Sequence, residues 1–140
     1  MDDYKNLVIF DLDGVLIDSK EYHFSALNEA LAFFDPKYVI SRNEHLSTFD
    51  GLPTKSKLQK LTDTKGLPSK LHDEVWRLKQ TKTLEILQNQ VHVDEELVCS
   101  LKHLKSLGYK IVVASNSIQT TVKIILTKLG LTEIIDFYLS

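Results

Sequence analysis

The stretch FDLDGVLIDS occupies residues 10–19 and overlaps the apolar run LVIF at residues 7–10. A short, unbroken run of large apolar residues is typical of a buried strand in a parallel sheet. Two carboxylates, Asp11 and Asp13, stand where this strand would end, and Gly14 comes next. Glycine allows a sharp turn and lets backbone amides come close to a phosphate group. The stretch therefore predicts a strand whose carboxyl end carries a reactive site.

Composition is that of an ordinary globular protein. The 140 residues are 43% hydrophobic and 26% charged, which fits one domain or one small domain with an insertion. A net charge of −2 gives no electrostatic footprint for nucleic acid or an anionic membrane. The chain starts MDDYK, unlike a signal peptide, and has no apolar stretch of bilayer length, so we expect a cytoplasmic protein. The single cysteine, Cys99, excludes an internal disulfide, and its helical apolar pattern predicts a core position.

Strands and helices alternate in the second half of the chain. Residues 110–115 (KIVVAS) predict a second strand, covered on both faces like the first, and residues 134–140 (IIDFYLS) predict a third. A helix capped by Asp94 and stopped by Gly108 precedes the second strand, and another helix over residues 117–130 follows it. The leucines expected to face inward on the first of these helices are Leu97, Leu101, Leu104 and Leu107. The fold class is therefore α/β, a Rossmann-like parallel sheet with right-handed crossovers.

Residues 19–90 interrupt this alternation with helices alone. Helical spacing predicts three helices, over residues 19–35, 53–66 and 68–90. Asp18 or Ser19 can cap the first of them. No segment of this region alternates like a strand. The pattern therefore predicts an α/β core, incomplete with three strands, made from residues 1–18 and 91–140, and a helical insertion over residues 19–90.

Polar residues follow both of the first two strands at one edge of the sheet. Open parallel sheets bind ligands beyond the carboxyl ends of their strands, where Asp11 and Asp13 follow the first strand and Ser115 and Asn116 the second. A carboxylate that attacks an anionic substrate needs a cation nearby and an acid to protonate the leaving oxygen. Once the chain turns at Gly14, both aspartates can address one reaction centre. Taken alone, the serines and asparagine could instead be a plain helix cap.

The motifs resemble those of the haloacid dehalogenase superfamily. DLDGVLIDS resembles its first motif, and VVASNS resembles its second, in the correct order at the correct strand ends. Residues 18–31 (DSKEYHFSALNEAL) are similar to the hinge and first cap helix of the β-phosphoglucomutase-like branch. Residues 47–58 (STFDGLPTKSKL) are similar to the cap segment of phosphatases in that branch. The resemblance spans essentially the whole chain.

The resemblance implies a role for each of these residues. Asp11 would be the nucleophile that forms an aspartyl-phosphate, and Asp13 the general acid and base. A Mg²⁺ ion would be held by the Asp11 carboxylate and the Asp13 backbone carbonyl. Ser115 and Asn116 would bind the phosphoryl oxygens, with the backbone at Gly14 close to the phosphate. The insertion would be a cap that closes over a small phosphorylated metabolite.

The acid at position 13 also narrows the reaction. Loss of halide from carbon needs no proton donor, and true dehalogenases of the superfamily lack an acid at the position of Asp13. The resemblance therefore implies a phosphatase or a β-phosphoglucomutase-like phosphomutase, which share every residue visible here. His23, on the helix near the hinge, is expected to be a packing or solvent-facing residue, with a role in closing the cap as the alternative.

Two further motifs of the superfamily are absent from the sequence. The resemblance implies a lysine after the third strand and an acidic pair after a fourth, whereas the sequence ends at Ser140. We therefore expect either the N-terminal part of a Mg²⁺-dependent phosphatase, C-terminally truncated, or an inactive remnant or binding module. We also expect the first strand, at residues 7–10, to lie at an unpaired edge through which the chain could associate with itself.

Overall fold

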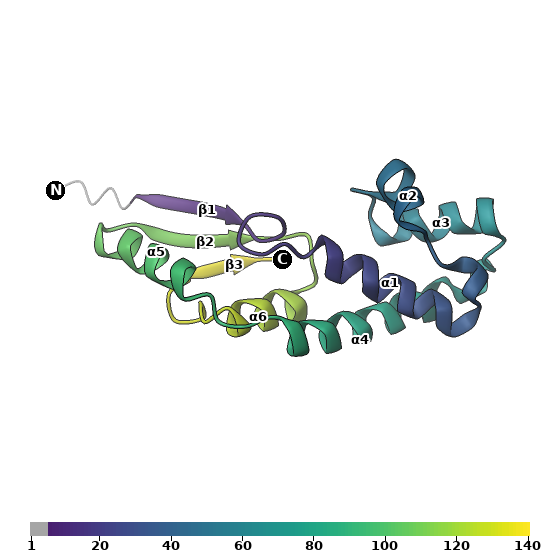
Figure 1. Cartoon of the computed structure of the whole chain (residues 1–140). Helices are drawn as coiled ribbons and strands as arrows, with labels where there is room; N and C mark the ends of the chain where they lie inside the picture. Colours follow the sequence, from purple (N-terminus) through teal and green to yellow (C-terminus); the bar gives the residue numbers. More distant parts are fainter. Residues whose placement is uncertain (1–5) are drawn as a thin grey trace. The chain divides into compact units, whose positions relative to one another are not determined.

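The structure is a computed structural model that describes residues 6–140. The chain forms two compact units, and Figure 1 shows both. The first is built from the two ends of the chain, up to Lys20 and from Ile86 on, and the second is Glu21–Glu85. These divisions fall a few residues from the limits expected for the insertion, residues 19 and 90. Each unit is described by itself below.

A three-stranded parallel sheet forms the centre of the first unit. Its strands are β1 (Leu7–Asp11), β2 (Lys110–Ala114) and β3 (Phe137–Leu139), in the order β1-β2-β3. The predicted α/β class and parallel sheet are thus confirmed, although the third strand is shorter than residues 134–140. β1 has a neighbour on one side only among the described residues, as expected for an edge strand.

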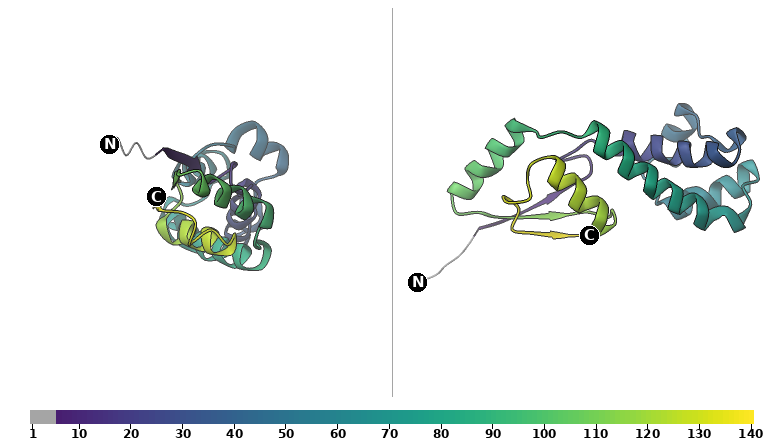
Figure 2. Two further views of the ribbon diagram at one scale, coloured as in Figure 1. Left: turned by 90° about the vertical axis from the view of Figure 1, so that its left-hand side faces the viewer. Right: turned by 90° about the horizontal axis from the view of Figure 1, so that it is seen from below.

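Both crossover helices of the first unit lie on the same side of the sheet. Right-handed connections that move in one direction across a parallel sheet place their helices on one face, and Figures 1 and 2 show this arrangement. Helix α5 (Glu95–Ser106) precedes β2, and α6 (Gln119–Lys128) follows it. The side chains buried between sheet and helices are apolar; among them are Val98, Leu101, Ile111, Val113, Val122 and Ile125.

The opposite face of the sheet is uncovered, which corrects the expectation that the first two strands are covered on both faces. Its exposed apolar side chains are Leu7 (56%), Ile9 (60%), Phe137 (58%) and Leu139 (50%). Strand side chains alternate between faces and register partners share a face, so this side also carries Asp11, Lys110, Val112 and Ala114. We call these eight residues the bare face. The sequence run LVIF is continuous, yet only half of it is packed.

One position on α5 and one directly after it also differ from their predictions. Asp94 caps the helix through Leu97 N, at 3.0 Å, as expected, and Leu101 is buried. Cys99 is exposed rather than in the core, and Leu107, which follows the last turn, is exposed too. Helix α5 is covered on its sheet side only, so its apolar stripe is narrower than the sequence pattern suggested.

The second unit is entirely helical. Its elements begin with α1 (Lys20–Phe34) and end with α4 (His72–Gln90), each of which extends into the first unit. Between them lie η1 (Pro36–Tyr38), α2 (Arg42–Glu44), η2 (His45–Phe49), α3 (Thr54–Lys65) and η3 (Ser69–Leu71). The three predicted helices are thus found, with α3 stopped by Gly66 at a φ of 73°. The short turns between residues 36 and 49 were not predicted.

Apolar packing and one side-chain amide hold the second unit together. Its core contains residues of α1, α3 and the connecting turns, and its largest members include Leu31, Tyr38, Ile40, Phe49, Leu61 and Leu67. The Asn28 amide donates to the Ile40 carbonyl at 2.8 Å and accepts from the Ile40 amide at 2.9 Å. Asn28 therefore pairs with the connecting segment as a neighbouring strand would. Within residues 6–140 no helix is both long and apolar enough to cross a membrane.

His45 is a buried titratable group in this unit. Its side chain is 6% exposed and lies against Phe24, with 4.4 Å between ring centroids. Burial lowers its pKa, and the positive charge of Lys57 lowers it further, while Asp50 and Glu21 act in the opposite direction. The second unit therefore favours neutral His45.

We predict that acidification destabilises the second unit through His45. Because the pKa of His45 is lower in the folded unit, the unfolded chain binds more protons, and stability falls as pH drops through about 6.5. Denaturant unfolding monitored by the single tryptophan, Trp76 on α4, should show a lower midpoint at pH 5.5 than at pH 7.5. His45→Gln should flatten this dependence, whereas His92→Gln, at an exposed site, should not. If the unfolding midpoint of His45→Gln depended on pH as strongly as that of the wild type, His45 would not be the group responsible.

Candidate active site

The candidate site lies where β1 and β2 end side by side. Asp11 is in register with Ala114, and the pairing continues one residue further because the Leu12 amide donates to the Ala114 carbonyl at 3.1 Å. This register places the residue after Leu12 beside the residue after Ala114. Asp13 and Ser115 are therefore neighbours in the fold, although 102 positions separate them in the sequence.

A tight turn follows β1 and fixes the direction of Asp13. The Leu12 carbonyl accepts from the amides of Leu16 at 3.1 Å and Ile17 at 3.2 Å, and the Gly14 amide donates to the Ile17 carbonyl at 2.7 Å. Gly14 has a φ of 82°, a conformation that side chains other than glycine rarely adopt. Leu12 is fully buried and anchors the turn. The glycine predicted from sequence is thus required by the backbone itself.

Three serine hydroxyls surround the Asp13 carboxylate. Ser115 Oγ donates to Asp13 Oδ2 at 2.8 Å, Ser19 Oγ donates to Asp13 Oδ1, and Ser117 Oγ lies 3.5 Å from Oδ2. The Ser117 amide also donates to Ser115 Oγ at 3.0 Å, which fixes that hydroxyl. Asp13 is half-buried and Ser19 is buried. These hydrogen bonds hold one carboxyl group in one orientation at the edge of the sheet.

Sequence reasoning missed the roles of Ser19 and Ser117. Ser19 was expected as a helix cap, but its hydroxyl is directed to Asp13. The signal available was the i, i+2 spacing of Ser115 and Ser117 after a strand, which brings both side chains to the same side of the chain. Ser19 gave no such signal, because it reaches Asp13 only through the turn at Gly14.

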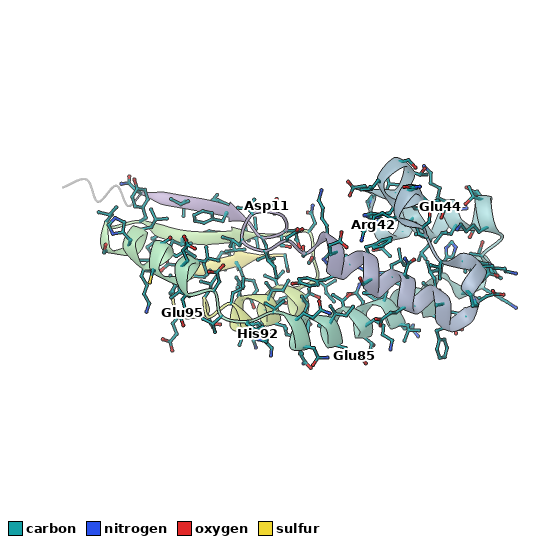
Figure 3. All side chains as sticks on the ribbon, viewed as in Figure 1. Asp11, Arg42, Glu44, Glu85, His92 and Glu95 are labelled. Carbon is teal, nitrogen blue, oxygen red and sulfur yellow. The ribbon has the colours of Figure 1, made fainter. Side chains whose placement is uncertain are left out.

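Asp11 stands at the end of β1 with an exposed side chain (Figure 3). No side-chain hydrogen bond joins its carboxylate to another of the described residues. Asn116 is also exposed, directly after Ser115. The structure therefore brings Asp13 and Ser115 into contact, and it leaves Asp11 and Asn116 open to solvent at the same edge. His23 is half-buried on α1 in the second unit.

Asp136 lies at the other end of the sheet, near the start of β2. Its carboxylate accepts from the Ile111 amide at 2.8 Å and pairs with Lys105 at 2.7 Å. Lys105 and the Ile111 amide hold the pKa of Asp136 below its ordinary value. This carboxylate therefore joins α5 to the start of β2 and is not available to a site at the carboxyl edge.

The donors at the carboxyl edge suit a magnesium ion in kind. Mg²⁺ prefers oxygen ligands and is commonly held by one or two carboxylates, with water and substrate phosphate completing the shell. The exposed Asp11 carboxylate and the Asp13 backbone carbonyl are oxygen donors of this type. Among residues 6–140, no three side chains of His, Cys, Asp or Glu gather into a metal cluster.

Comparison with known proteins identifies a family. Residues 8–140 match the family described as haloacid dehalogenase-like hydrolase. No curated protein sequence matches the chain significantly.

Several solved structures share the fold over nearly the whole chain. A predicted phosphoglycolate phosphatase from Haemophilus somnus is 23% identical, with a TM-score of 0.79 over 99% of this chain and 63% of its own. A candidate β-phosphoglucomutase from Thermotoga maritima is 21% identical, with a TM-score of 0.72 over 96% and 60%. CbbY from Rhodobacter sphaeroides, in complex with xylulose-1,5-bisphosphate, is 18% identical, with a TM-score of 0.78 over 95% and 62%. The chain thus spans about three fifths of the length of these structures.

We predict that Ser19→Ala destabilises the first unit. The substitution removes a donor from a carboxylate that cannot fully regain water, which should lower the free energy of unfolding by about 1–2 kcal/mol. Urea unfolding followed by hydrogen exchange of the Leu12 and Val113 amides would measure the loss. Ser25→Ala, at an exposed site on α1, is the matched control and should change stability by less than about 0.5 kcal/mol. Equal effects of the two substitutions would contradict the role given to Ser19.

Proposed function

Because the chain belongs to the haloacid dehalogenase-like hydrolase family, we propose that its site transfers a phosphoryl group, with hydrolysis of a small phosphate monoester as the reaction. The observation that carries the proposal is that two carboxylates lie at the same edge of the sheet. Asp11 is exposed, and Asp13 is held by serine hydroxyls. Asp11 can attack the phosphorus atom as the nucleophile, and Asp13 can donate and accept a proton as the general acid and base. Phosphate ester hydrolysis through a covalent intermediate needs both roles.

In the proposed first step, a carboxylate oxygen of Asp11 attacks phosphorus and the bond to the ester oxygen breaks. Asp13 gives its proton to that oxygen, so the alcohol leaves neutral and an aspartyl-phosphate remains on Asp11. In the second step Asp13, now a carboxylate, takes a proton from the attacking water, and inorganic phosphate leaves. Asp11 is regenerated, and Asp13 is protonated again.

The serine hydroxyls suit Asp13 for both steps. A hydroxyl can donate a hydrogen bond to a carboxylate and can rotate to accept one from a protonated carboxyl group. Ser115 and Ser19 can therefore hold Asp13 in either protonation state without moving their heavy atoms. Because Asp13 keeps its position, it can deliver its proton to the leaving ester oxygen with the same geometry in every turnover.

Magnesium is the cofactor we propose for this site. The Asp11 carboxylate and the Asp13 backbone carbonyl would hold it, and when bound it would offset the repulsion between a phosphate group and the two aspartates. Asn116 and the backbone at Gly14 are proposed partners of the phosphoryl oxygens, and Ser115 is a third when Asp13 is protonated, because its hydroxyl can then accept from Asp13 and donate to the phosphoryl group. The proposed substrate is a small phosphorylated metabolite, and residues 19–90, with His23 near their start, are proposed as the cap. A cytoplasmic location is part of the same proposal.

Phosphomutase activity is the second candidate, supported by the structural likeness to the candidate β-phosphoglucomutase from Thermotoga maritima. In that case a second hydroxyl of the substrate, not water, would take the phosphoryl group from Asp11. Product analysis separates the two reactions, since a mutase releases an isomeric phosphate and a phosphatase releases inorganic phosphate. The chain spans about three fifths of the length of its structural neighbours. We therefore propose that a longer protein that contains this chain is active, and that these 140 residues alone are not.

The third candidate is that the chain is an inactive remnant or a binding module.

We predict that Asp11→Asn abolishes Mg²⁺-dependent phosphatase turnover in a protein that carries this chain with the remaining motifs of the family. Asparagine keeps the size of the side chain but cannot act as the nucleophile, so kcat should fall at least about 1,000-fold. Release of inorganic phosphate from a sugar phosphate measures it. Asp18→Asn, an exposed neighbour, is the control and should keep turnover. Substantial activity in Asp11→Asn would remove the nucleophile assignment.

The 140-residue chain alone should be nearly inactive. It offers a magnesium ion few protein oxygens, and no lysine after β3 is present to offset the charge of the phosphate. Turnover well below about 1 s⁻¹ is expected in the same phosphate-release assay. A rate like that of ordinary enzymes would show that another residue of this chain supplies the missing charge.

Asp13→Asn should affect esters according to their leaving groups. A leaving group that needs little protonation bypasses the acid, so activity in the variant should recover with p-nitrophenyl phosphate relative to an alkyl phosphate, by about tenfold or more. The ratio of kcat/KM for the two esters, in wild type and variant, is the measurement. An equal loss on both would argue against Asp13 as the acid.

A further inference from the structure

Helix α5 carries a thiol and an imidazole on its outer side. Cys99 and His103 are both exposed and stand four residues apart, whereas Val98 and Leu101 are buried. Residues at positions i and i+4 of a helix lie on one face, with their Cβ atoms about 5–6 Å apart. The two side chains are therefore neighbours because of α5 alone, and no other element is needed to bring them together.

Neither of these two side chains is engaged elsewhere. Among residues 6–140, no side-chain hydrogen bond or ion pair involves the Cys99 thiol or the His103 ring. The His103 carbonyl accepts from Ser106 Oγ at 2.6 Å, but this backbone contact does not use the ring nitrogens. Both donor groups can therefore turn toward a common point.

We propose that Cys99 and His103 form a two-ligand site for a thiophilic divalent cation, with Zn²⁺ as its type. Thiolate sulfur and imidazole nitrogen are the donors that Zn²⁺ prefers, whereas Mg²⁺ takes oxygen. The spacing is the one at which two histidines of a single helix bind zinc in the H-E-x-x-H motif. No third side chain of His, Cys, Asp or Glu joins the pair within the described residues, so water completes the shell.

Binding involves a proton transfer and no redox change. The Sγ–H proton of Cys99 passes to solvent as the bond from sulfur to the metal forms, and a neutral ring nitrogen of His103 donates its electron pair. Glu95 lies one turn before Cys99 on the same face and attracts a cation, while Lys102, next to His103, repels it. These two charges oppose each other, so the affinity rests on the two ligand bonds and is expected to be lower than that of a closed four-ligand site.

The bound ion would act on α5 itself. It joins two successive turns of the helix, so it binds the folded chain better than the unfolded chain and raises stability. It also engages the sulfur of an exposed thiol, and exposure is one of the features that make a thiol prone to oxidation. This role is separate from phosphoryl transfer and does not depend on the function proposed above.

Cobalt titration of the 140-residue chain is the first experiment, because Co²⁺ replaces Zn²⁺ at sulfur and nitrogen donors and is visible by absorption. Excess Mg²⁺ competes for sites built from oxygen alone, and a phosphine reductant keeps Cys99 reduced. The wild type should show a sulfur-to-cobalt charge-transfer band that saturates at one ion per chain and disappears when Zn²⁺ is added. Cys99→Ala should show no such band. Absence of the band in the wild type, or saturation at half an ion per chain, would overturn the single-chain site.

Histidine variants then test the spacing. His103→Ala should weaken cobalt binding at least about tenfold, the scale on which even changes outside the ligand shell act. Ser106→His in the His103→Ala background puts a histidine on the same side of α5 but about 10 Å from Cys99 along the axis, so affinity should not return. His92→Gln removes an exposed histidine outside α5 and should bind like the wild type.

Circular dichroism establishes that each variant is folded. Equal binding by His103→Ala and His92→Gln would overturn the role of His103. Full recovery through Ser106→His would overturn the requirement for adjacent turns of α5, and with it the two-ligand site.

Discussion

The parallel pairing of β1 with β2 is the constraint on which the rest of the molecule depends. Its register, Asp11 beside Ala114, brings the segment after one strand next to the segment after the other. The buried Leu12 and the turn at Gly14 then direct Asp13 toward Ser115. A shift of one residue in this register would turn Asp11 to the opposite face of the sheet. It would also separate the Asp13 carboxylate from the hydroxyls of Ser115 and Ser117. The chemistry proposed for the site therefore depends first on the register between β1 and β2, because this register positions the reactive side chains.

The same pairing explains why one side of the sheet is packed and the other is not. Two right-handed crossovers in one direction place α5 and α6 together, and the apolar residues of β2 that face them, Ile111 and Val113, are fully buried. Elements that cover the second face of such a sheet must come from connections that run the other way across it. None occurs among residues 6–140, where β1 is the end of the strand order.

Much of this structure was predictable from the sequence, for identifiable reasons. The LVIF and KIVVA runs identified parallel strands, and Asp94 and Gly66 marked helix ends, because these signals are local. The proximity of Asp13 to Ser115 followed from the general rule for parallel sheets. The exposure of Leu7 and Cys99 did not, because a continuous apolar pattern cannot tell whether a second layer is present. The contribution of Ser19 was hidden for another reason: it depends on the path of a turn, which spacing alone does not give.

The insertion of the second unit between β1 and β2 has a consequence for the order of folding. The contact between Asp13 and Ser115 closes a loop of 102 residues, and the entropy lost on closure grows with loop length. If Glu21–Glu85 folds first, most of that loop becomes a compact body and only the short flanking segments remain flexible. By the logarithmic law this lowers the closure cost by roughly 1 kcal/mol. A helical unit rich in local contacts also folds quickly, so it can serve as a scaffold on which the slower parallel sheet is completed.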